Sequence, residues 1–214
     1  MFEYAGASGG FIDRLGYPFC RGRIFETVEK DAGQYDTVMP IFWATGAALL
    51  IRQADYQMVG GLDGRFFAHN EEIDLCWRLR CRGRMIVCVP QSRVYHVGGA
   101  TLKKENPRKT FLNFRNNLLM LYKNLPEAEL NAVMRMRFVL DYVAAAVFIL
   151  KGDWKNAVAV YKARQEYASM RPSFKGDREE DLRCTVVSDI PERKKYSIVW
   201  QSKLKGNKRF VQLP

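Results

Sequence analysis

Closely paired cysteines are missing from this 214-residue sequence, which contains no Cys-x-x-Cys motif. A structural zinc site normally needs such spacing, and an odd number of cysteines is not typical of a disulfide framework. The sequence therefore predicts buried, reduced thiols in a cytosolic protein. The five cysteines are Cys20, Cys76, Cys81, Cys88 and Cys184.

Long apolar runs and phosphate-binding glycine loops are missing as well. The longest apolar run, Phe138 to Leu150, has 13 residues and contains Asp141, whereas a membrane-spanning helix needs about 20. The N-terminal sequence MFEYAGASGG has neither the basic segment nor the apolar core of a signal peptide. Its glycines follow no strand pattern, so they do not form a dinucleotide-binding fingerprint. We expect no membrane span, no signal peptide and no Rossmann-type phosphate loop.

Charge is abundant and unevenly distributed along the chain, which has a formal net charge of +11. Residues 1–100 contain 11 Lys or Arg and 11 Asp or Glu, whereas residues 101–214 contain 23 and 12. A neutral front and a basic back predict two parts with different tasks, the second facing an anionic partner such as phospholipid or nucleic acid. Phospholipid is favoured over nucleic acid, because no nucleic-acid-binding motif accompanies the charge.

The first half of the chain gives short, mixed signals. Met1–Pro40 is predicted to be loop with short helical or strand pieces. The apolar stretch Ile41–Arg52 suits a buried strand, and Gln53–Val59 suits one or two helical turns closed by Gly60-Gly61. Apolar spacing predicts a helix over Glu71–Arg82 that ends at Gly83. Two short strands are then expected, the first over residues 85–89 and the second over residues 93–97.

Helix signals dominate the second half. Apolar positions predict helices over Arg108–Asn124 and from Pro126 to about Leu150, and Asp153 is placed to cap a third, Trp154 to about Met170. The first of these is expected to be amphipathic, with Arg115 and Lys123 adding positive charge around it. The tail from residue 171 is charged and weakly patterned; it is predicted to form short strands over 185–187 and 197–199, or no fixed structure.

A cluster of carboxylates opens the helix predicted after residue 70. It comprises Glu71, Glu72 and Asp74. Carboxylates are common at helix starts because free N–H groups and the helix dipole favour negative charge there. On composition alone, this structural explanation outweighs a catalytic one. The surrounding residues change the balance.

Those residues form an ordered string. Gly60-Gly61 is followed by Asp63, Phe66-Phe67, Glu71-Glu72, Asp74-Leu75 and Arg78. The string resembles the Gly-Gly-aromatic-Asp, Phe-Phe, Glu-Asp and Asp-Leu-x-x-Arg pattern of family 2 glycosyltransferases, which are inverting enzymes of GT-A fold that use nucleotide sugars. The resemblance covers Trp43 to Thr101 and, more loosely, the helices to about Met170. It implies an α/β chain, namely the C-terminal half of a GT-A domain with its Rossmann-like mixed sheet, followed by an α-helical extension.

The resemblance also implies a division of the chain. Residues 1–106 would be the acceptor-side half of the catalytic domain, residues 107–170 a basic amphipathic helical extension, and residues 171–214 a charged, weakly structured tail. The half of the domain that holds the nucleotide would then lie outside this chain, which would make the chain inactive alone.

The same resemblance assigns roles to the acidic pair and to a late histidine. Glu72 matches the general base that takes the proton from the acceptor hydroxyl, with Glu71 beside it; Glu stands where the family more often has Asp. His96 resembles the histidine that completes a divalent-cation site, for Mn²⁺ or Mg²⁺. The main ligands of that cation would come from an Asp-x-Asp motif, which occurs nowhere in this sequence.

Other positions would form the substrate-binding wall. Trp43, Thr45 and Gly46 match a strand edge that faces donor and acceptor, although Trp43 could equally be an ordinary core residue. Asp74 and Arg78 would complete the wall. Their i, i+4 spacing also suits a stabilising ion pair, which is the favoured explanation.

By resemblance, the chain would take part in transferring a sugar from a nucleotide-diphosphate donor to a glycan or polyprenyl-linked acceptor, with inversion, in cell-surface polysaccharide synthesis. It would be cytoplasmic and peripheral at the inner membrane face. The segment Arg135-Met136-Arg137 beside Phe138-Val139-Leu140 suits an anionic membrane interface. Alternatively, these helices pack on the catalytic domain or on a second copy in a homo-oligomer. A further alternative is a non-catalytic remnant that binds membrane or acceptor.

Overall fold

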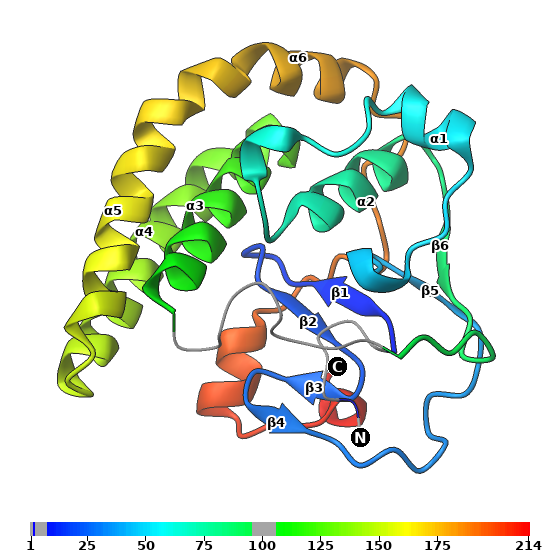
Figure 1. Cartoon of the computed structure of the whole chain (residues 1–214), viewed down its shortest axis with the longest axis horizontal. Helices are drawn as coiled ribbons and strands as arrows, with labels where there is room; N and C mark the ends of the chain where they lie inside the picture. Colours follow the sequence, from blue (N-terminus) through cyan, green and yellow to red (C-terminus); the bar gives the residue numbers. More distant parts are fainter. Residues whose placement is uncertain (1, 3–7, 96–105) are drawn as a thin grey trace. The chain divides into compact units, whose positions relative to one another are not determined.

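The computed structural model describes residue 2, residues 8–95 and residues 106–214 of the chain (Figure 1). The described residues divide into two compact units. Unit 1 draws on Met1–Leu62, Leu75–His96 and Val186–Pro214, and unit 2 on Asp63–Asp74 and Val97–Thr185. The chain is thus mixed α/β, with small sheets in unit 1 and mostly helices in unit 2. The expected α/β class is confirmed at this level; the GT-A half-domain and the predicted boundaries at residues 106 and 170 stay predictions.

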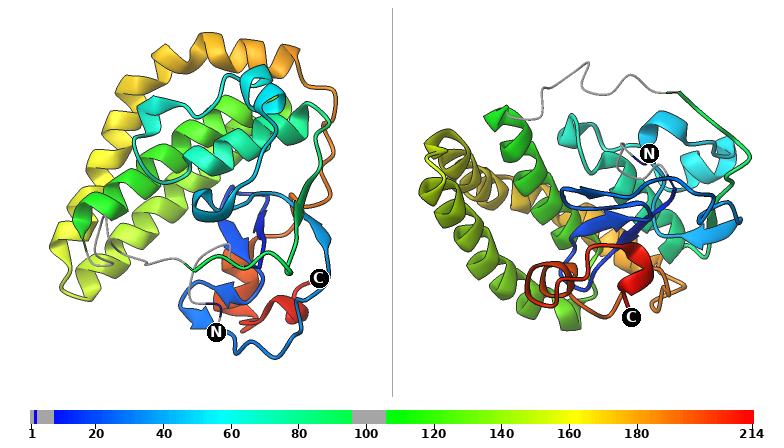
Figure 2. Two further views of the ribbon diagram at one scale, coloured as in Figure 1. Left: turned by 45° about the vertical axis from the view of Figure 1, so that its right-hand side comes forward. Right: turned by 90° about the horizontal axis from the view of Figure 1, so that it is seen from below.

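Unit 1 begins with a small antiparallel meander of four strands. These are β1 (Gly10–Ile12), β2 (Pro18–Cys20), β3 (Arg23–Ile24) and β4 (Thr27–Val28), which pair in sequence order. In Figure 2 they are the short blue arrows. The turn between β1 and β2 depends on Asp13, whose Oδ1 accepts hydrogen bonds from the N–H groups of Leu15 (2.9 Å) and Tyr17 (2.8 Å). Short strands in Met1–Pro40 are therefore confirmed.

A second ribbon in unit 1 joins β5 (Met39–Ile41) and β6 (Ile86–Cys88) in antiparallel pairing, with Met39 opposite Cys88. It confirms a strand within residues 85–89. Two residues past β5, a bridge pairs Trp43 with Gly10 of β1. Glycine is needed at position 10, since a Cβ there would lie 2.1 Å from the Trp43 indole. The bridge thus brings the two small sheets of unit 1 together.

The strand predicted over Ile41–Arg52 is wrong beyond its first residues. After Trp43 the chain makes a 3₁₀ turn over Gly46–Ala48, in which Ala48 N–H donates to the Thr45 carbonyl (3.0 Å). Small residues such as Gly and Ala have low strand propensity. The helix α1 (Gln53–Met58) follows as predicted, and Gly60 and Gly61 both take positive φ angles, 74° and 70°. Of the strand predicted over 93–97, residues 93–95 are not a strand, and residues 96 and 97 lie outside the described residues.

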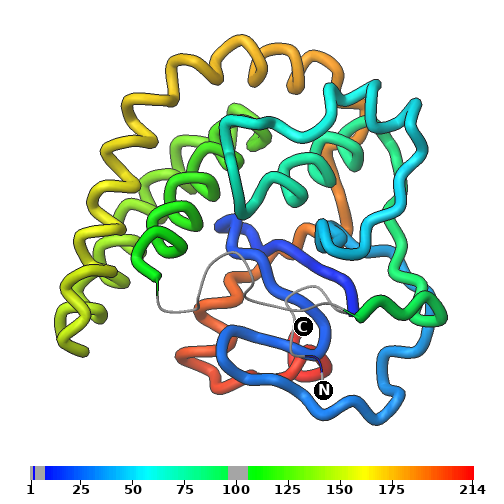
Figure 3. Tube along the Cα trace, in the orientation of Figure 1, coloured from blue at the N-terminus to red at the C-terminus, as the bar shows by residue number. Residues whose placement is uncertain are grey.

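The last segment of the chain, Val186–Pro214, belongs to unit 1 and packs into its core. Figure 3 shows this segment, coloured orange to red, beside the blue strands of the meander. Ile198 is fully buried in a cluster with Phe11, Phe19, Ile24 and Ile41. Its N–H also donates to Asp13 Oδ2 (2.8 Å), so the same carboxylate bonds the turn after β1 and this distant segment.

The short strands predicted over 185–187 and 197–199 are wrong. The tail contains α6 (Lys175–Arg183), a π-helical turn over Trp200–Leu204 and a 3₁₀ turn over Phe210–Gln212. Instead of a strand ladder, the N–H groups of Val186 and Val187 both donate to one carbonyl, that of Cys81 (2.8 and 3.1 Å). Strand formation needs a partner strand, and the described residues offer none at either place.

Unit 2 is built on three long helices, α3 (Pro107–Asn124), α4 (Glu127–Leu150) and α5 (Trp154–Met170). They run side by side in Figure 2 and contact one another pairwise. All three were predicted, and Asp153 caps α5 as expected by accepting from Asn156 N–H (3.2 Å). Asn106 caps α3 by accepting from Arg108 N–H (2.9 Å). Within the described residues, no helix is both long and apolar enough to cross a membrane.

The C-terminal half of α3 is buried on every side rather than on one face only. Every residue from Arg115 to Leu121 is buried, so α3 is the central helix of unit 2. Arg115 and Lys123 are buried too, 7% and 4% exposed, because each is paired with a carboxylate. Hydrophobic periodicity cannot reveal this arrangement, since the polar residues of α3 face partners inside the unit rather than water.

A buried ionic cluster connects α4 to α5. Asp141 is 0% exposed and accepts from Arg137 of its own helix (3.3 Å) and from Arg164 of α5 (2.6 Å). Arg137, 1% exposed, also donates to Asn117 of α3. Arg137 was expected at a membrane interface together with Arg135; this is wrong for Arg137, because burial of a charged group requires such partners and Asp141 supplies one.

We predict that Asp13→Asn lowers the free energy of unfolding by about 1–3 kcal/mol. The amide keeps one accepting oxygen and replaces the other with a donor, so the N–H groups of Leu15, Tyr17 and Ile198 cannot all stay bonded. Chemical denaturation followed by circular dichroism measures the change. Asp36→Asn, at an exposed position, is the control and should shift stability by less than about 0.5 kcal/mol. Equal stability of the two variants would contradict the role of Asp13.

Candidate active site

The acidic helix predicted after residue 70 is present as α2 (Glu71–Cys81), and Gly83 follows it with a φ of 77°. Glu71, Glu72 and Asp74 all lie in the first turn. The backbone before the helix is unusual, because three residues other than glycine have positive φ angles: Phe67 (65°), His69 (71°) and Asn70 (70°). Such conformations cost energy and persist where surrounding contacts hold them. The contacts that hold this loop come from α3.

Two neighbouring polar side chains of α3 bind the backbone of the loop. The Asn116 amide nitrogen lies 2.9, 2.8 and 2.8 Å from the carbonyl oxygens of Phe66, Ala68 and His69. The Arg115 guanidinium donates to the Phe66 carbonyl (3.2 Å) and to Glu166 of α5 (2.7 Å). Asn116 is 0% exposed, so these bonds form away from water. They fix the path of the chain immediately before Glu71.

A buried lysine near the end of α3 holds both ends of the same segment. Lys123 Nζ lies 3.1 Å from Asp63 Oδ2 and 3.1 Å from Asp74 Oδ2. Asp74 is 0% exposed and also accepts from the Asn124 amide (2.7 Å). Asp74 was predicted in the substrate-binding wall; the structure places its carboxylate among these partners.

The carboxylate of Asp63 has a second cation beside it. Arg65 donates to both Asp63 oxygens, at 2.8 and 2.6 Å. Burial by itself would raise the pKa of Asp63, but the hydrogen bond from Arg65 and the charge of Lys123 outweigh it and hold the pKa well below its usual range. Asp63 is therefore a permanent anion that supports the loop.

Glu71 and Glu72 differ from the aspartates around them. Each has one carboxylate oxygen, Oε2, that is buried without a hydrogen-bond partner among the described residues. Burial, with a further contribution from the charge of Glu71, raises the pKa of Glu72 to about 7. A carboxylate with that pKa near neutral pH can both accept and return a proton, which is the property a general base needs.

His69 is a residue that sequence analysis missed. Its Nε2 is buried and has no partner among the described residues. Burial, together with the nearby charge of Lys109, lowers the pKa of the imidazole, so the ring is neutral at physiological pH. The position of His69, two residues before Glu71, could have identified it as a candidate site residue. A single histidine in a loop, however, does not indicate a site unless its structural surroundings are known.

The other predicted wall residues lie in unit 1. Trp43 is buried, and its indole N–H donates to the Phe11 carbonyl (2.9 Å). Thr45 is half-buried and Gly46 exposed, at the 3₁₀ turn after it. Arg78 is 3% exposed and donates to the carbonyls of Val59 and Gly61, so it closes the Gly60-Gly61 turn. These contacts give Trp43 and Arg78 structural roles within unit 1, and their roles toward substrate stay predictions.

The predicted metal ligand, His96, lies outside the described residues. Among the residues that are described, no group of three or more His, Cys, Asp or Glu side chains could hold a metal ion. The two aspartates nearest the acidic pair, Asp63 and Asp74, already share Lys123. The described side chains of this chain therefore do not form a divalent-cation site.

Comparison with known proteins gives partial matches to glycosyltransferases. The chain is 34% identical over 88 residues to N-acetylglucosaminyl-diphospho-decaprenol L-rhamnosyltransferase of Mycobacterium tuberculosis, covering 41% of this chain and 28% of that protein. It is 35% identical over 69 residues to rhamnosyltransferase WbbL of Escherichia coli, covering 32% and 25%. It is 24% identical over 132 residues to a low-salt glycan biosynthesis hexosyltransferase of Haloferax volcanii, covering 54% and 43%.

These matches support a glycosyltransferase family at the level of distant, partial similarity. The chain spans about a quarter of the length of the two rhamnosyltransferases it matches. No family model matches the sequence, and no solved structure matches it significantly.

We predict that Lys123→Met lowers the free energy of unfolding by about 3–5 kcal/mol. The substitution keeps the apolar stem but leaves the buried carboxylates of Asp63 and Asp74 without their shared cation. Thermal and chemical denaturation measure the loss. The control is Lys155→Met on α5, where the lysine is exposed and the change should be nearly neutral. A small effect at position 123 would show that Arg65 and Asn124 suffice to hold the two aspartates.

The pKa of Glu72 predicts how stability depends on pH. The unfolded chain loses this proton near the ordinary pKa of 4.5, whereas the folded chain keeps it up to about pH 7. The unfolded state therefore binds fewer protons in this interval, and stability falls as pH rises from about 4.5 to 7. Glu72→Gln removes the titration, so the variant should be more stable than the wild type near pH 8 by on the order of 1–3 kcal/mol and equal to it near pH 4.

Denaturation curves at both pH values check this expectation. Glu179→Gln, on an exposed side chain that is 67% accessible, is the matched control and should change stability equally little at both pH values. A Glu72→Gln variant that is less stable than the wild type at pH 8 would mean that the carboxylate has a stabilising partner.

Proposed function

We propose that this chain contributes the acceptor-side part of an enzyme that transfers a sugar from a nucleotide-diphosphate donor to a glycan or lipid-linked acceptor, with inversion. One observation carries the proposal, namely the buried and unpaired carboxylate oxygen of Glu72, with a pKa of about 7, at the start of α2. The similarity to rhamnosyltransferases and a hexosyltransferase supports the reaction class. The GT-A fold and the wider domain remain part of the proposal.

The chemistry assigned to Glu72 is a single proton transfer. The carboxylate accepts the proton of the acceptor hydroxyl while that oxygen forms a bond to the anomeric carbon of the donor sugar. The bond from the anomeric carbon to the nucleoside diphosphate breaks, and the diphosphate leaves with the electron pair. Attack from the face opposite the leaving group inverts the anomeric centre. Burial, and to a lesser extent the charge of Glu71, keeps the pKa of Glu72 high, which makes the carboxylate a stronger base.

The loop before α2 has a supporting role in this proposal. Catalytic groups must be held close to the reacting atoms with little freedom. Asn116 and Arg115 fix the loop carbonyls, and Lys123 fixes Asp63 and Asp74 on either side of it. Glu72 therefore lies on a segment that is bonded on both flanks, while its own Oε2 is left without a hydrogen-bond partner among the described residues.

The donor's charge needs neutralising, and the family resemblance assigns this to Mn²⁺ or Mg²⁺. The described residues do not form such a site, and the sequence has no Asp-x-Asp motif. The acceptor class also bears on location, since the matched Mycobacterium tuberculosis protein is named for a decaprenol-linked substrate. A lipid-linked acceptor would place this chain at the cytoplasmic face of a membrane.

The test is Glu72→Gln in the assembled enzyme of this proposal. Turnover should fall by about a hundredfold to ten-thousandfold, because a general base typically contributes that much. Binding of the nucleotide-sugar donor should stay nearly the same, since the amide preserves size and Glu72 faces the acceptor. Release of nucleoside diphosphate measures turnover, and NMR of the product gives the anomeric configuration.

Glu71→Gln is the matched control on the same helical turn. It should shift the pH at which the rate is half-maximal downward, by removing a neighbouring charge, and cost far less turnover. Preserved turnover in Glu72→Gln would rule out Glu72 as the base. Retention of configuration in the product would overturn the single-displacement reaction altogether.

A further inference from the structure

The helix α4 has a long outward face without charge. From residue 136 to residue 150, its exposed side chains are all apolar or aromatic. They recur at helical spacing and cover the side of α4 opposite to the buried Asp141. We call this surface the α4 face; its main members are Met136, Val139, Val143, Val147, Ile149 and Leu150. A monomer rarely leaves such a continuous apolar surface in water unless it binds something.

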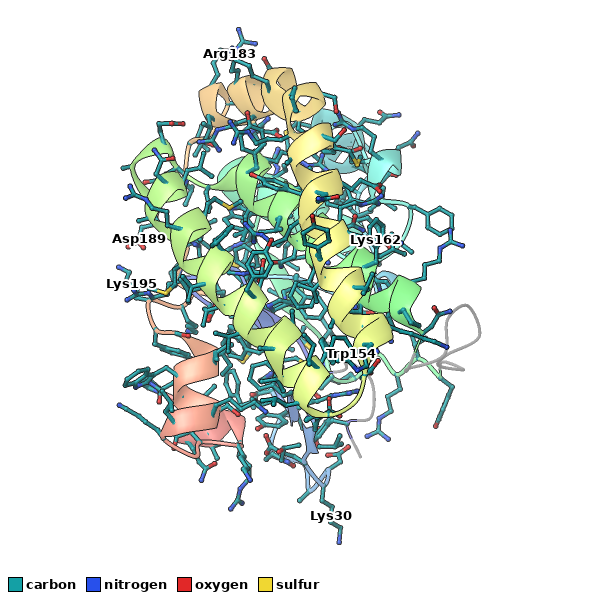
Figure 4. All side chains as sticks on the ribbon, turned by 90° about the vertical axis from the view of Figure 1, so that its left-hand side faces the viewer. Lys30, Trp154, Lys162, Arg183, Asp189 and Lys195 are labelled. Atoms are coloured by element: carbon teal, nitrogen blue, oxygen red, sulfur yellow. The ribbon has the colours of Figure 1, made fainter. Side chains whose placement is uncertain are left out.

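The α4 face continues into the turn that joins α4 to α5. Leu150 is 86% exposed and Trp154 62% exposed, and the exposed lysines Lys151 and Lys155 alternate with them. We call these four residues the hairpin tip. Figure 4 looks onto α4 and α5 and labels Trp154 at this tip and Lys162 farther along α5. Tryptophan beside lysine is the composition found where a protein meets lipid headgroups.

Between residues 130 and 165, the exposed charged side chains are all basic, namely Arg135, Lys151, Lys155 and Lys162. Before this stretch, the first turn of α4 carries Glu127, which is paired with Arg178, and the half-buried Glu129. The two acids of this stretch, Asp141 and Asp153, are not exposed. Asp141 is paired with arginines inside the unit, and Asp153 caps α5. The surface around the α4 face is therefore basic and attracts anions.

The same charges disfavour a second copy of this chain as the partner that covers the α4 face. An antiparallel pair of copies centred on the α4 face would bring Arg135 of one copy against Lys151 of the other. A parallel pair would bring the lysines of the two hairpin tips together. Like charges that meet at an apolar contact are destabilising. An anionic surface relieves this repulsion in either orientation.

We propose that the α4 face and the hairpin tip dock on an anionic phospholipid surface. The helix α4, with 24 residues, would lie in the plane of the interface, with its apolar side chains among the acyl chains. Lys151, Lys155 and Arg135 would contact the headgroup phosphates. The biological reason for such docking rests on the proposed function, since a lipid-linked acceptor is presented at a membrane surface. The structural support for it is the exposure and charge of α4 and α5.

The test is binding of the full chain to vesicles of phosphatidylglycerol, compared with vesicles of phosphatidylcholine. Binding should be detected on the anionic vesicles at low salt and should weaken steeply as salt is raised toward physiological ionic strength. Lys151→Ala with Lys155→Ala should lower the affinity by about 25-fold, since each lysine near a membrane contributes about fivefold. Leu150→Ser with Trp154→Ser should lower it at least about tenfold through lost apolar burial.

Matched controls come from unit 1. Leu204 (67% exposed) and Trp200 (56% exposed) are as accessible as Leu150 and Trp154, and Lys203 and Lys205 stand beside them. Leu204→Ser with Trp200→Ser, and Lys203→Ala with Lys205→Ala, should leave vesicle binding within about twofold of the wild type. Circular dichroism of every variant confirms that the helices are retained.

Three results would overturn the proposal. The first is no binding to anionic vesicles at low salt, and the second is equal loss of binding in the unit 1 controls. The third is a concentration-dependent dimer, detected by sedimentation, that is abolished by Val139→Glu with Val143→Glu. That result would mean that a second copy of the chain covers the α4 face. Vesicle binding needs no sugar donor, so it can succeed while transfer fails. Transfer to a water-soluble acceptor should in turn survive the hairpin-tip variants, which separates this surface from the chemistry of Glu72.

Discussion

The ammonium of Lys123 is the interaction on which the candidate site depends. It is 4% exposed and lies 3.1 Å from one oxygen each of Asp63 and Asp74. These aspartates stand at the two ends of the segment that carries the loop and the first turn of α2. Without the shared cation, two buried carboxylates would face a low-dielectric interior, at a cost of several kcal/mol. One lysine of α3 therefore fixes where α2 begins and how its first turn is oriented.

The carboxylates in the first turn of α2 differ in their hydrogen bonding. Asp74 has partners for both oxygens, from Lys123 and Asn124. Two residues earlier, Glu72 keeps one buried oxygen without any among the described residues. Leaving a buried acceptor unbonded costs stability, and nothing in a purely structural helix start requires it. The loss is intelligible if a substrate hydroxyl supplies the missing bond. Asp74, two residues later, keeps the same turn bonded to α3 through Lys123 and Asn124.

Sequence reasoning succeeded where structure is local and failed where it depends on distant partners. The helices α2 to α5 were predicted from apolar spacing and caps, which act within a few residues. The strand predicted over Ile41–Arg52 failed because a strand exists only where a neighbour pairs with it. The acidic pair was found from its motif, but His69 and Lys123 were not. A lysine in a helix normally faces solvent, and only the fold shows that Lys123 pairs with two aspartates.

The net charge of the second half of the chain illustrates the same limit. An excess of basic residues in residues 101–214 predicted an anionic partner, as though every arginine and lysine were on the surface. Arg115, Lys123 and Arg137 are instead buried in ion pairs, so they stabilise unit 2 and contribute nothing to an outer potential. Other basic residues stay exposed, including Arg135, Lys151, Lys155 and Lys162 on α4 and α5 and further lysines and arginines on α6 and in residues 195–209. A charge count alone cannot distinguish these two uses, since pairing cancels charge in the interior while exposure preserves it. The membrane docking proposed for α4 and α5 depends on the exposed subset there, and it should respond to substitutions in that subset far more than to changes in total charge.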